Sequence, residues 1–203
     1  MRLQAQFVAS ATAPSSYPRW NRREVAFVGR SNVGKSSLLN ALTGIHGLAR
    51  TSKLPGRTRA VNFFACGELL ALVDLPGYGY AKMSRAEAEE KSRLLRDYLT
   101  RRPQLVGLVL LIDARRGPEP EELELIELVR SRKRDTVSRT LIVVATKGDK
   151  LRSAQRAQAL ARFRNADLEP IICSAMNGEG IDKLRRRVLA LAHDEAAAST
   201  IDG

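Results

Sequence analysis

One stretch of eight residues constrains this chain more than any other: Gly29 to Ser36 read Gly-Arg-Ser-Asn-Val-Gly-Lys-Ser. The spacing is that of a phosphate-binding loop, a Gly, four residues and then Gly-Lys-Ser. The preceding residues 24–28 are mostly apolar and free of Gly and Pro, which predicts a buried strand. Residues 37–42 carry leucines at helical spacing. A strand, a loop and a helix in this order predict an α/β fold.

The chemistry expected of this loop follows from its residue types. Gly29 and Gly34 let the backbone curl so that successive N–H groups face one pocket, and the helix start adds its positive dipole end. Lys35 is expected near the β- and γ-phosphates, and the Ser36 hydroxyl is expected to ligate Mg²⁺. The alternative is a chance match in which the loop merely turns. The predicted nucleotide contacts here are Gly29, Arg30, Ser31, Asn32, Val33, Gly34, Lys35, Ser36 and Ser37.

Composition narrows the class of protein. With 203 residues, 44% of them hydrophobic, the chain suits one α/β domain. No apolar run approaches the roughly 20 residues that cross a bilayer, and the N-terminus shows no secretory signal. The two cysteines lack metal-ligand spacing, which favours a reduced, cytoplasmic protein.

The net charge of +12 indicates more than solubility. A charge of this size attracts nucleic acid or an anionic membrane. Because no amphipathic membrane helix is evident, RNA or DNA is the favoured partner, although charge alone does not choose between them.

Strand patterns alternate with helix patterns along the chain, which predicts a mostly parallel six-stranded sheet covered by helices on both faces. The expected parts are an N-terminal arm (1–23), one domain (24–192) and a flexible tail (193–203), with residues 4–8 as an additional edge strand. The expected strands are 24–28, 61–65, 69–73, 105–112, 141–145 and 171–173, and the expected helices are 37–44, 84–102, 119–134, 153–165 and 180–192.

A second motif follows the strand at 69–73. Asp74 ends that strand, where ligands of α/β sheets collect, and a carboxylate there holds Mg²⁺ in phosphate-loop enzymes. Gly77 offers an N–H to the γ-phosphate. Asp-x-x-Gly by itself is also a common turn, so its position downstream of the loop carries the prediction. The predicted contacts are Asp74, Leu75, Pro76 and Gly77.

The third motif decides the base. Guanine presents N1–H and its 2-amino group side by side, and one carboxylate, here Asp149, accepts from both, whereas adenine lacks this pair. The Lys147 stem can cover the face of the base, and a backbone N–H near Ser174 can reach the guanine O6. A solvated turn is the alternative for Lys-Gly-Asp alone. The predicted base contacts are Thr146, Lys147, Gly148, Asp149, Cys173, Ser174 and Ala175.

These motifs, with Pro55–Thr58, match the signatures of translation-factor-related small GTPases. More narrowly, residues 29–37, the Pro-Gly-Tyr-Gly-Tyr-Ala of residues 76–81 and the Leu-Ile-Asp-Ala-Arg of residues 111–115 resemble the EngB (YihA/YsxC) family within the TrmE-Era-EngA-EngB-Septin-like GTPases. The resemblance spans roughly residues 6–192. The chain departs from that pattern with Gly148, where Ala is usual, and Asn177, where Lys is common.

The resemblance implies a three-layer P-loop GTPase that binds GTP or GDP with Mg²⁺ and hydrolyses GTP slowly. It implies catalytic roles for Lys35, Thr58 and Gly77, and Mg²⁺ ligation by Ser36, Thr58 and Asp74. The segment 45–60 becomes a candidate switch. Tyr78 stands where other GTPases place a water-orienting glutamine, and Asn32 resembles an asparagine that helps bind K⁺. The implied switch contacts are Gly56, Arg57, Thr58, Arg59 and Ala60.

The resemblance also implies a role in assembly of the large ribosomal subunit, linked to cell division and septation, as a monomer without stable membrane association. Basic clusters are candidate rRNA contacts, although each alone also fits a solvated helix face. The clusters are Arg130/Arg132/Lys133/Arg134, Arg152/Arg156, Arg162/Arg164 and Arg185/Arg186/Arg187.

Two alternative functions remain. One is a small-molecule kinase, and the other is a GTPase module that regulates an RNA-modifying or membrane partner.

Overall fold

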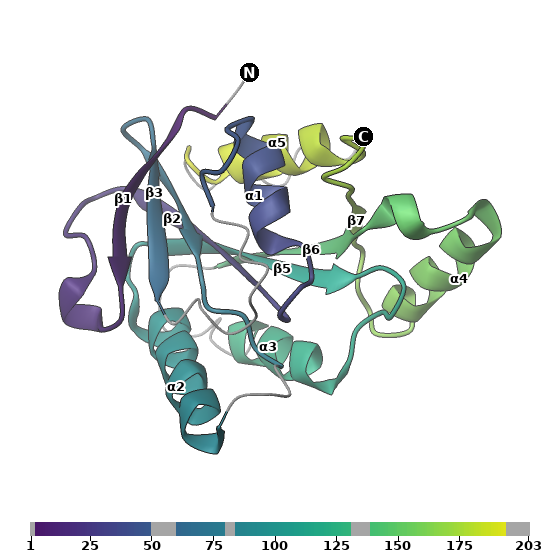
Figure 1. Cartoon of the computed structure of the whole chain (residues 1–203), viewed down its shortest axis with the longest axis horizontal. Coiled ribbons are helices and arrows are strands. Elements are labelled where there is room, and N and C mark those ends of the chain that lie inside the picture. Colours follow the sequence, from purple (N-terminus) through teal and green to yellow (C-terminus); the bar gives the residue numbers. More distant parts are fainter. Residues whose placement is uncertain (1–2, 50–59, 80–83, 131–138, 194–203) are drawn as a thin grey trace.

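The described part of the chain forms a seven-stranded sheet in the order β1-β3-β4-β2-β5-β6-β7, with helices on both of its faces (Figure 1). The computed structural model describes residues 3–49, 60–79, 84–130 and 139–193. The strands β4, β2, β5, β6 and β7 run parallel, and β1 and β3 pair antiparallel at one edge. The fold is therefore the expected α/β arrangement.

The strands are β1 (Ala5–Ala11), β2 (Arg23–Gly29), β3 (Val61–Cys66), β4 (Leu70–Asp74), β5 (Leu105–Asp113), β6 (Thr140–Thr146) and β7 (Ile171–Ile172). The helices are α1 (Lys35–Thr43), α2 (Arg85–Arg101), α3 (Pro120–Arg130), α4 (Ser153–Arg164) and α5 (Ile181–Ala190). Two 3₁₀ turns, η1 (Pro14–Ser16) and η2 (Gly148–Lys150), complete the described elements.

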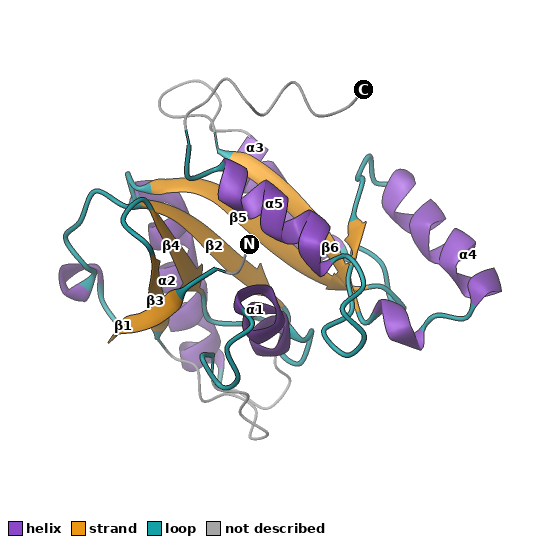
Figure 2. Ribbon diagram, turned by 90° about the horizontal axis from the view of Figure 1, so that it is seen from above, coloured by secondary structure: helices purple, strands orange, loops and turns teal. Residues whose placement is uncertain are grey.

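The central strands are apolar on both faces because each face carries its own core. In β2, Val25 and Phe27 belong to the core under α1 and α5, whereas Ala26 and Val28 belong to the core under α2 and α3. The side chains of β5 and β6 divide between the two cores in the same alternating way. Figure 2 shows α1 and α5 together on one side of the sheet. This two-sided burial explains the nearly continuous apolar runs of these strands.

The described part of the chain forms seven strands where the predicted sheet has six, and the seventh is the additional edge strand expected over residues 4–8, which extends to Ala11. Residues 5–11, which the sequence places in an N-terminal arm, form β1 and pair with β3 from Ala5↔Cys66 to Ala11↔Val61. The antiparallel β3 has a free edge whose N–H and C=O groups need partners, and β1 supplies them. The division into arm, domain and tail stays a prediction, and residues 194–203 lie outside the described part.

The helix boundaries follow local signals. Ser84 caps α2, and its side chain and that of Glu87 form the predicted reciprocal capping box. The helix expected over 119–134 is described as far as Arg130, and residues 131–138 lie outside the described part. No helix of the described ranges combines the length and the apolar character that a membrane crossing requires.

A buried polar cluster fixes the chain between η1 and β2 to the end of α2. The carboxylate of Glu24, which is fully buried, accepts from Arg102 Nη2 at 2.5 Å, Tyr98 Oη at 2.6 Å and Trp20 Nε1 at 2.7 Å. Arg102 also donates to the carbonyl of Pro18 at 2.8 Å and lies over the ring of Tyr17. A buried ion pair between Glu24 and Arg102 thus helps to hold the segment between η1 and β2 against the end of α2.

We expect Arg102→Ala to lower the free energy of unfolding by about 3 kcal/mol, because it leaves a buried carboxylate without its cation. Urea denaturation followed by circular dichroism measures the change. Arg101→Ala is the matched control: the Arg101 side chain is 82% exposed, so its loss should cost less than about 0.5 kcal/mol. Equal effects of the two substitutions would contradict this assignment.

Candidate nucleotide-binding site

The phosphate loop leaves the carboxyl end of β2, the central strand, where ligands of such sheets collect. Gly29 lies so close to β5 that a Cβ there would stand 2.7 Å from the carbonyl oxygen of Leu111 and 2.9 Å from Val33 Cγ1. Gly34, at φ +103°, is the N-cap of α1. Both glycines are required by the backbone path, as the motif predicts.

Lys35 and Asp74 form an ion pair that joins the loop to the end of β4. The register Phe27↔Asp74 between β2 and β4 brings the carboxylate to the loop, and both side chains are nearly buried, at 11% and 6% exposure. The other oxygen of Asp74 accepts from Asn62 Nδ2 at 3.3 Å. The hydroxyl of Ser36 and this carboxylate are hard oxygen donors of the kind that Mg²⁺ prefers.

The segment after Asp74 rests on the phosphate loop. The N–H of Ser31 donates to the carbonyl oxygen of Tyr78 at 2.9 Å, and a Cβ on Gly77 would stand 3.2 Å from the carbonyl oxygen of Gly29. The hydroxyl of Tyr78 donates to Oε1 of Glu122 in α3 at 3.0 Å. Burial and the neighbouring Glu122 carboxylate raise the pKa of Tyr78 far above its usual value. Tyr78 is therefore a neutral side chain engaged by α3.

The side chain of Arg30 also points to α3 rather than into the loop. Its guanidinium donates to the carboxylate of Glu119 and lies 3.9 Å from that of Glu121. The side chain of Arg30 is therefore engaged by Glu119, and only the backbone of this residue is placed to contact a nucleotide.

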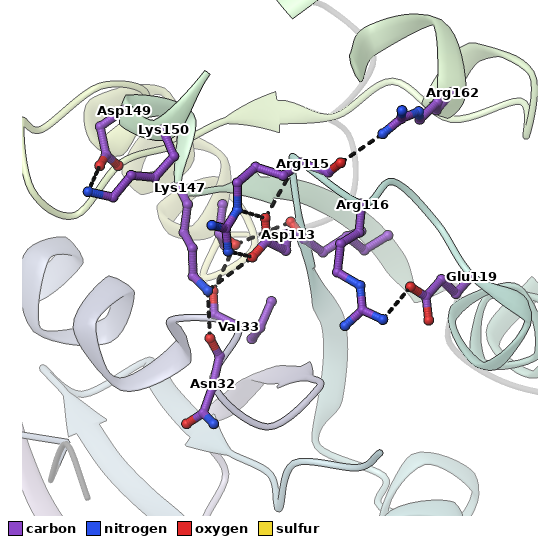
Figure 3. A network of polar contacts seen from close by, with 12 residues as sticks. Asn32, Val33, Asp113, Arg115, Arg116, Glu119, Lys147, Asp149, Lys150 and Arg162 are labelled. Carbon is purple, nitrogen blue, oxygen red and sulfur yellow. Dashed lines mark hydrogen bonds and ion pairs between the residues drawn. The ribbon is translucent and has the colours of Figure 1, made fainter. Parts of the chain in front are cut away.

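The guanine motif is held against the phosphate loop by two neighbouring side chains. The hydroxyl of Thr146 donates to the carbonyl oxygen of Val33 at 2.8 Å, and Nζ of Lys147 donates to that of Asn32 at 2.8 Å. Lys147 has a left-handed backbone, at φ +61°. Figure 3 shows its ammonium between Asn32 and Asp113. Residues more than a hundred positions apart therefore form one surface.

Asp149 is oriented by the other predicted base contact. Oγ of Ser174 donates to Oδ1 of Asp149 at 2.7 Å, and Nζ of Lys150 lies 3.5 Å from Oδ2. The hydrogen bond from Ser174 lowers the pKa of Asp149, so the carboxylate is ionised at neutral pH. The N–H of Gly148 donates to the carbonyl oxygen of Cys173 at 3.1 Å, which ties the two predicted segments together.

Gly148 has no room for a side chain. A Cβ at this position would stand 2.6 Å from Cγ2 of Ile172 in β7 and 3.1 Å from Oε2 of Glu179. Alanine is usual at this position in the EngB family, but in this chain a methyl group of Ile172 occupies the space that an alanine side chain would need.

The structure brings the phosphate-loop, Asp74–Gly77, Thr146–Asp149 and Cys173–Ala175 residues to one edge of the sheet, at the carboxyl ends of the parallel strands. Ala60 immediately precedes β3. Gly56, Arg57, Thr58 and Arg59 lie outside the described residues, so their predicted roles stay predictions. A cavity of about 300 Å³ opens beside the loop, between Arg30, Asp113 and Glu119.

Sequence reasoning assigned no site role to two acidic residues that the structure places here. Asp113 accepts from Nζ of Lys147 at 3.0 Å, and Glu122, which is 2% exposed, accepts from Tyr78. Asp113 had a usable signal, since it ends an otherwise apolar strand as Asp74 does. Glu122 had none, because acidic residues are common in the first turn of any helix.

Comparison with known proteins now adds to this geometry. Residues 24–147 match the family model described as 50S ribosome-binding GTPase. A probable GTP-binding protein EngB from Anaeromyxobacter dehalogenans strain 2CP-C is 43% identical over 215 residues, covering 98% of this chain and 96% of the relative. The chain belongs to the EngB family of GTPases.

Solved structures agree with this membership at the level of the fold. A crystal structure of a probable GTP-binding protein EngB superposes with a TM-score of 0.67 at 24% identity, covering 83% of this chain and 98% of that one. The structure of Era in complex with MgGDPNP and a 16S ribosomal RNA fragment gives a TM-score of 0.64 at 24% identity, covering 87% of this chain and 59% of Era. The EngB-family chain is thus a P-loop GTPase by fold and by sequence.

Proposed function

We propose that this EngB-family GTPase is a guanine-specific switch with slow intrinsic hydrolysis that acts in assembly of the large ribosomal subunit, linked to cell division and septation. One observation carries the guanine part: Ser174 orients an ionised Asp149, which lies two residues after a lysine that is hydrogen-bonded to the phosphate loop. A carboxylate there accepts from both guanine donors and has no matching pair on adenine.

Phosphate binding requires one exchange of partners. Lys35 pairs with Asp74 in the structure, and a triphosphate would compete for this ammonium. Released from Lys35, the carboxylate of Asp74 and the hydroxyl of Ser36 would hold Mg²⁺, which supplies charge that neutralises the phosphate oxygens. Lys35, the Gly77 N–H and Thr58 are the proposed catalytic groups, with Thr58 as the third Mg²⁺ ligand.

The position of Tyr78 supports slow hydrolysis. Its hydroxyl is engaged by Glu122, and a phenol lacks the paired donor and acceptor with which an amide orients an attacking water. Glu122 is itself held in place, because its second oxygen accepts from the N–H of Glu119 at 2.9 Å. The hydroxyl of Tyr78 is therefore bound by α3 and is not available to orient the attacking water.

Asp149→Asn tests the base assignment. The amide can donate to the 2-carbonyl of xanthine but can no longer accept two guanine donors, so we expect GDP affinity to fall by about a hundredfold and xanthosine diphosphate to bind better than GDP. Isothermal titration calorimetry with GDP, xanthosine diphosphate and ADP measures this. A variant that still prefers GDP, or a wild-type chain that takes ADP as readily as GDP, would refute guanine recognition by this residue.

Potassium is the proposed transition-state cation, with Asn32 as a ligand. Asn32 is exposed, and its side-chain amide points away from Lys147 (Figure 3). K⁺ bound there would add positive charge in the place of an arginine finger. We expect phosphate release to be about tenfold faster in KCl than in NaCl, and Asn32→Ala to remove the difference. Equal rates of the wild-type chain in both salts would disprove the potassium role.

Four observations support the ribosomal part of the proposal. The matching family model is described as ribosome-binding, the neighbour Era was solved with ribosomal RNA, the net charge is +12, and α4 and α5 carry exposed arginines. The structure narrows the candidate contacts, because Arg156 pairs with Glu179 at 2.6 Å and Arg185 donates to the carbonyl oxygen of Leu42 at 2.9 Å. Arg130 and Arg162 likewise donate to the carbonyl oxygens of Asp167, at 3.3 Å, and Arg115, at 2.7 Å. The remaining described candidates are Arg152, Arg164, Arg186 and Arg187.

Co-sedimentation with large ribosomal subunits tests this surface. We expect more chain to sediment with GTP than with GDP and binding to weaken steeply with salt. Arg186→Ala/Arg187→Ala should reduce the salt slope by about two. Arg93→Ala/Arg96→Ala removes the same charge from the exposed face of α2 and serves as the control. Salt-insensitive binding, or equal losses in both variants, would contradict the α5 contact.

We also propose a cytoplasmic monomer without stable membrane association. The two thiols are free and buried, and burial raises the pKa of Cys66 to about 11 and that of Cys173 to about 12. Such thiols are unreactive and suit a reducing compartment.

A further inference from the structure

The ends of β5 and β6 lie side by side: Asp113 ends β5, and Lys147 directly follows β6. The two strands are parallel with Asp113 opposite Thr146, and the N–H of Ala114 continues the ladder by donating to the Thr146 carbonyl at 2.9 Å. Asp113 is therefore the neighbour of the first residues of the guanine motif. Its side chain is 10% exposed, so its charge needs partners within the protein.

Arg115 supplies most of those partners. Its guanidinium donates from Nε to Oδ1 of Asp113 at 2.9 Å and from Nη2 to Oδ2 at 2.7 Å, and its backbone N–H adds a third bond to Oδ1 at 3.1 Å (Figure 3). Burial by itself would raise the pKa of Asp113, but the hydrogen bonds from Arg115 and Lys147 hold it well below the ordinary value. The carboxylate is ionised and fixed in orientation by a two-pronged contact.

The oxygen that Arg115 orients is the one that Lys147 uses. Nζ of Lys147 donates to Oδ2 of Asp113 at 3.0 Å and to the carbonyl oxygen of Asn32 at 2.8 Å. An ammonium on a four-carbon stem has many rotamers, and two acceptors at fixed positions select one of them. The position of the lysine stem therefore depends on the orientation of Asp113.

We propose that Arg115 is a positioning residue for guanine-nucleotide binding, which acts through Asp113 to hold Lys147 in the conformation that receives the base. This inference rests on the proposed assignment of Lys147 and Asp149 to the base. Arg115 lies outside the four nucleotide motifs, at the end of the Leu-Ile-Asp-Ala-Arg segment.

The chain offers a matched control in the next residue. Arg116 has the same charge and a similar exposure, 54% against 50% for Arg115, but it pairs with Glu119 at 2.7 Å instead of Asp113. Loss of general attraction to phosphate would be the same for both arginines. Only loss of the contact with Asp113 would separate them.

We expect Arg115→Ala to weaken GDP binding about fivefold, since a half-exposed charge pair contributes modestly, and Arg116→Ala to change it by less than about twofold. Isothermal titration calorimetry with GDP measures both, and thermal unfolding verifies that the variants fold. The decisive comparison is Lys147→Ala with and without Arg115→Ala, where the effect of Arg115 should vanish because its target is gone. In GTP hydrolysis, Arg115→Ala should raise KM and leave kcat unchanged.

Three outcomes would overturn the proposal: equal effects of Arg115→Ala and Arg116→Ala, an undiminished effect of Arg115→Ala in the Lys147→Ala background, or a fall in kcat without a rise in KM. When binding to Lys147→Ala is too weak for calorimetry, the split between KM and kcat decides. Asp149→Asn separates this failure from that of the base assignment. If Asp149→Asn still prefers GDP, the base assignment fails; if it behaves as expected while the two arginine variants agree, only the role of Arg115 fails.

Discussion

The site depends on how the carbonyl groups of the phosphate loop are satisfied. A loop whose N–H groups converge on one pocket must turn carbonyl groups the other way, and carbonyl groups that face the protein need donors from it. Thr146 and Lys147 provide those donors to Val33 and Asn32. The residues that follow β6 therefore complete the phosphate loop as well as framing the base, and the parallel alignment of strand ends makes this possible.

Helix α3 and the residue before it also contribute to the site. Glu119, the residue before α3, binds Arg30 of the phosphate loop, and Glu122 in the first turn of α3 accepts from Tyr78 of the segment after β4. Burial raises the pKa of Glu122, while its contacts with Tyr78 and with the N–H of Glu119 act in the opposite direction. A buried carboxyl group that receives hydrogen bonds at both oxygens is a fixed anchor. Tyr78, the residue after Gly77, is thus fixed to α3.

Much of this was predictable from the sequence because the motifs are local and act through the backbone. Gly29 to Ser36 required a strand before it and a helix after it, and both are present. Side-chain contacts between residues far apart in the sequence were not predictable, since the bond from Lys147 to Asp113 depends on the register of β5 with β6. For the same reason Arg185 could not be separated from Arg186 in sequence, although one bonds to the backbone of α1 and the other is exposed. The edge strand β1 was only suggested, because its uncharged residues also fit an extended arm.

The lack of space for a side chain at Gly148 has a consequence for how this position can vary among relatives. Cγ2 of Ile172 occupies the volume that an alanine side chain at position 148 would need. The loop that reads the base and the last strand of the sheet therefore share a single packing volume, and neither position can enlarge unless the other shrinks. Among family members we expect these two sites to covary, with alanine at the first accompanied by a slimmer or differently rotated side chain at the second.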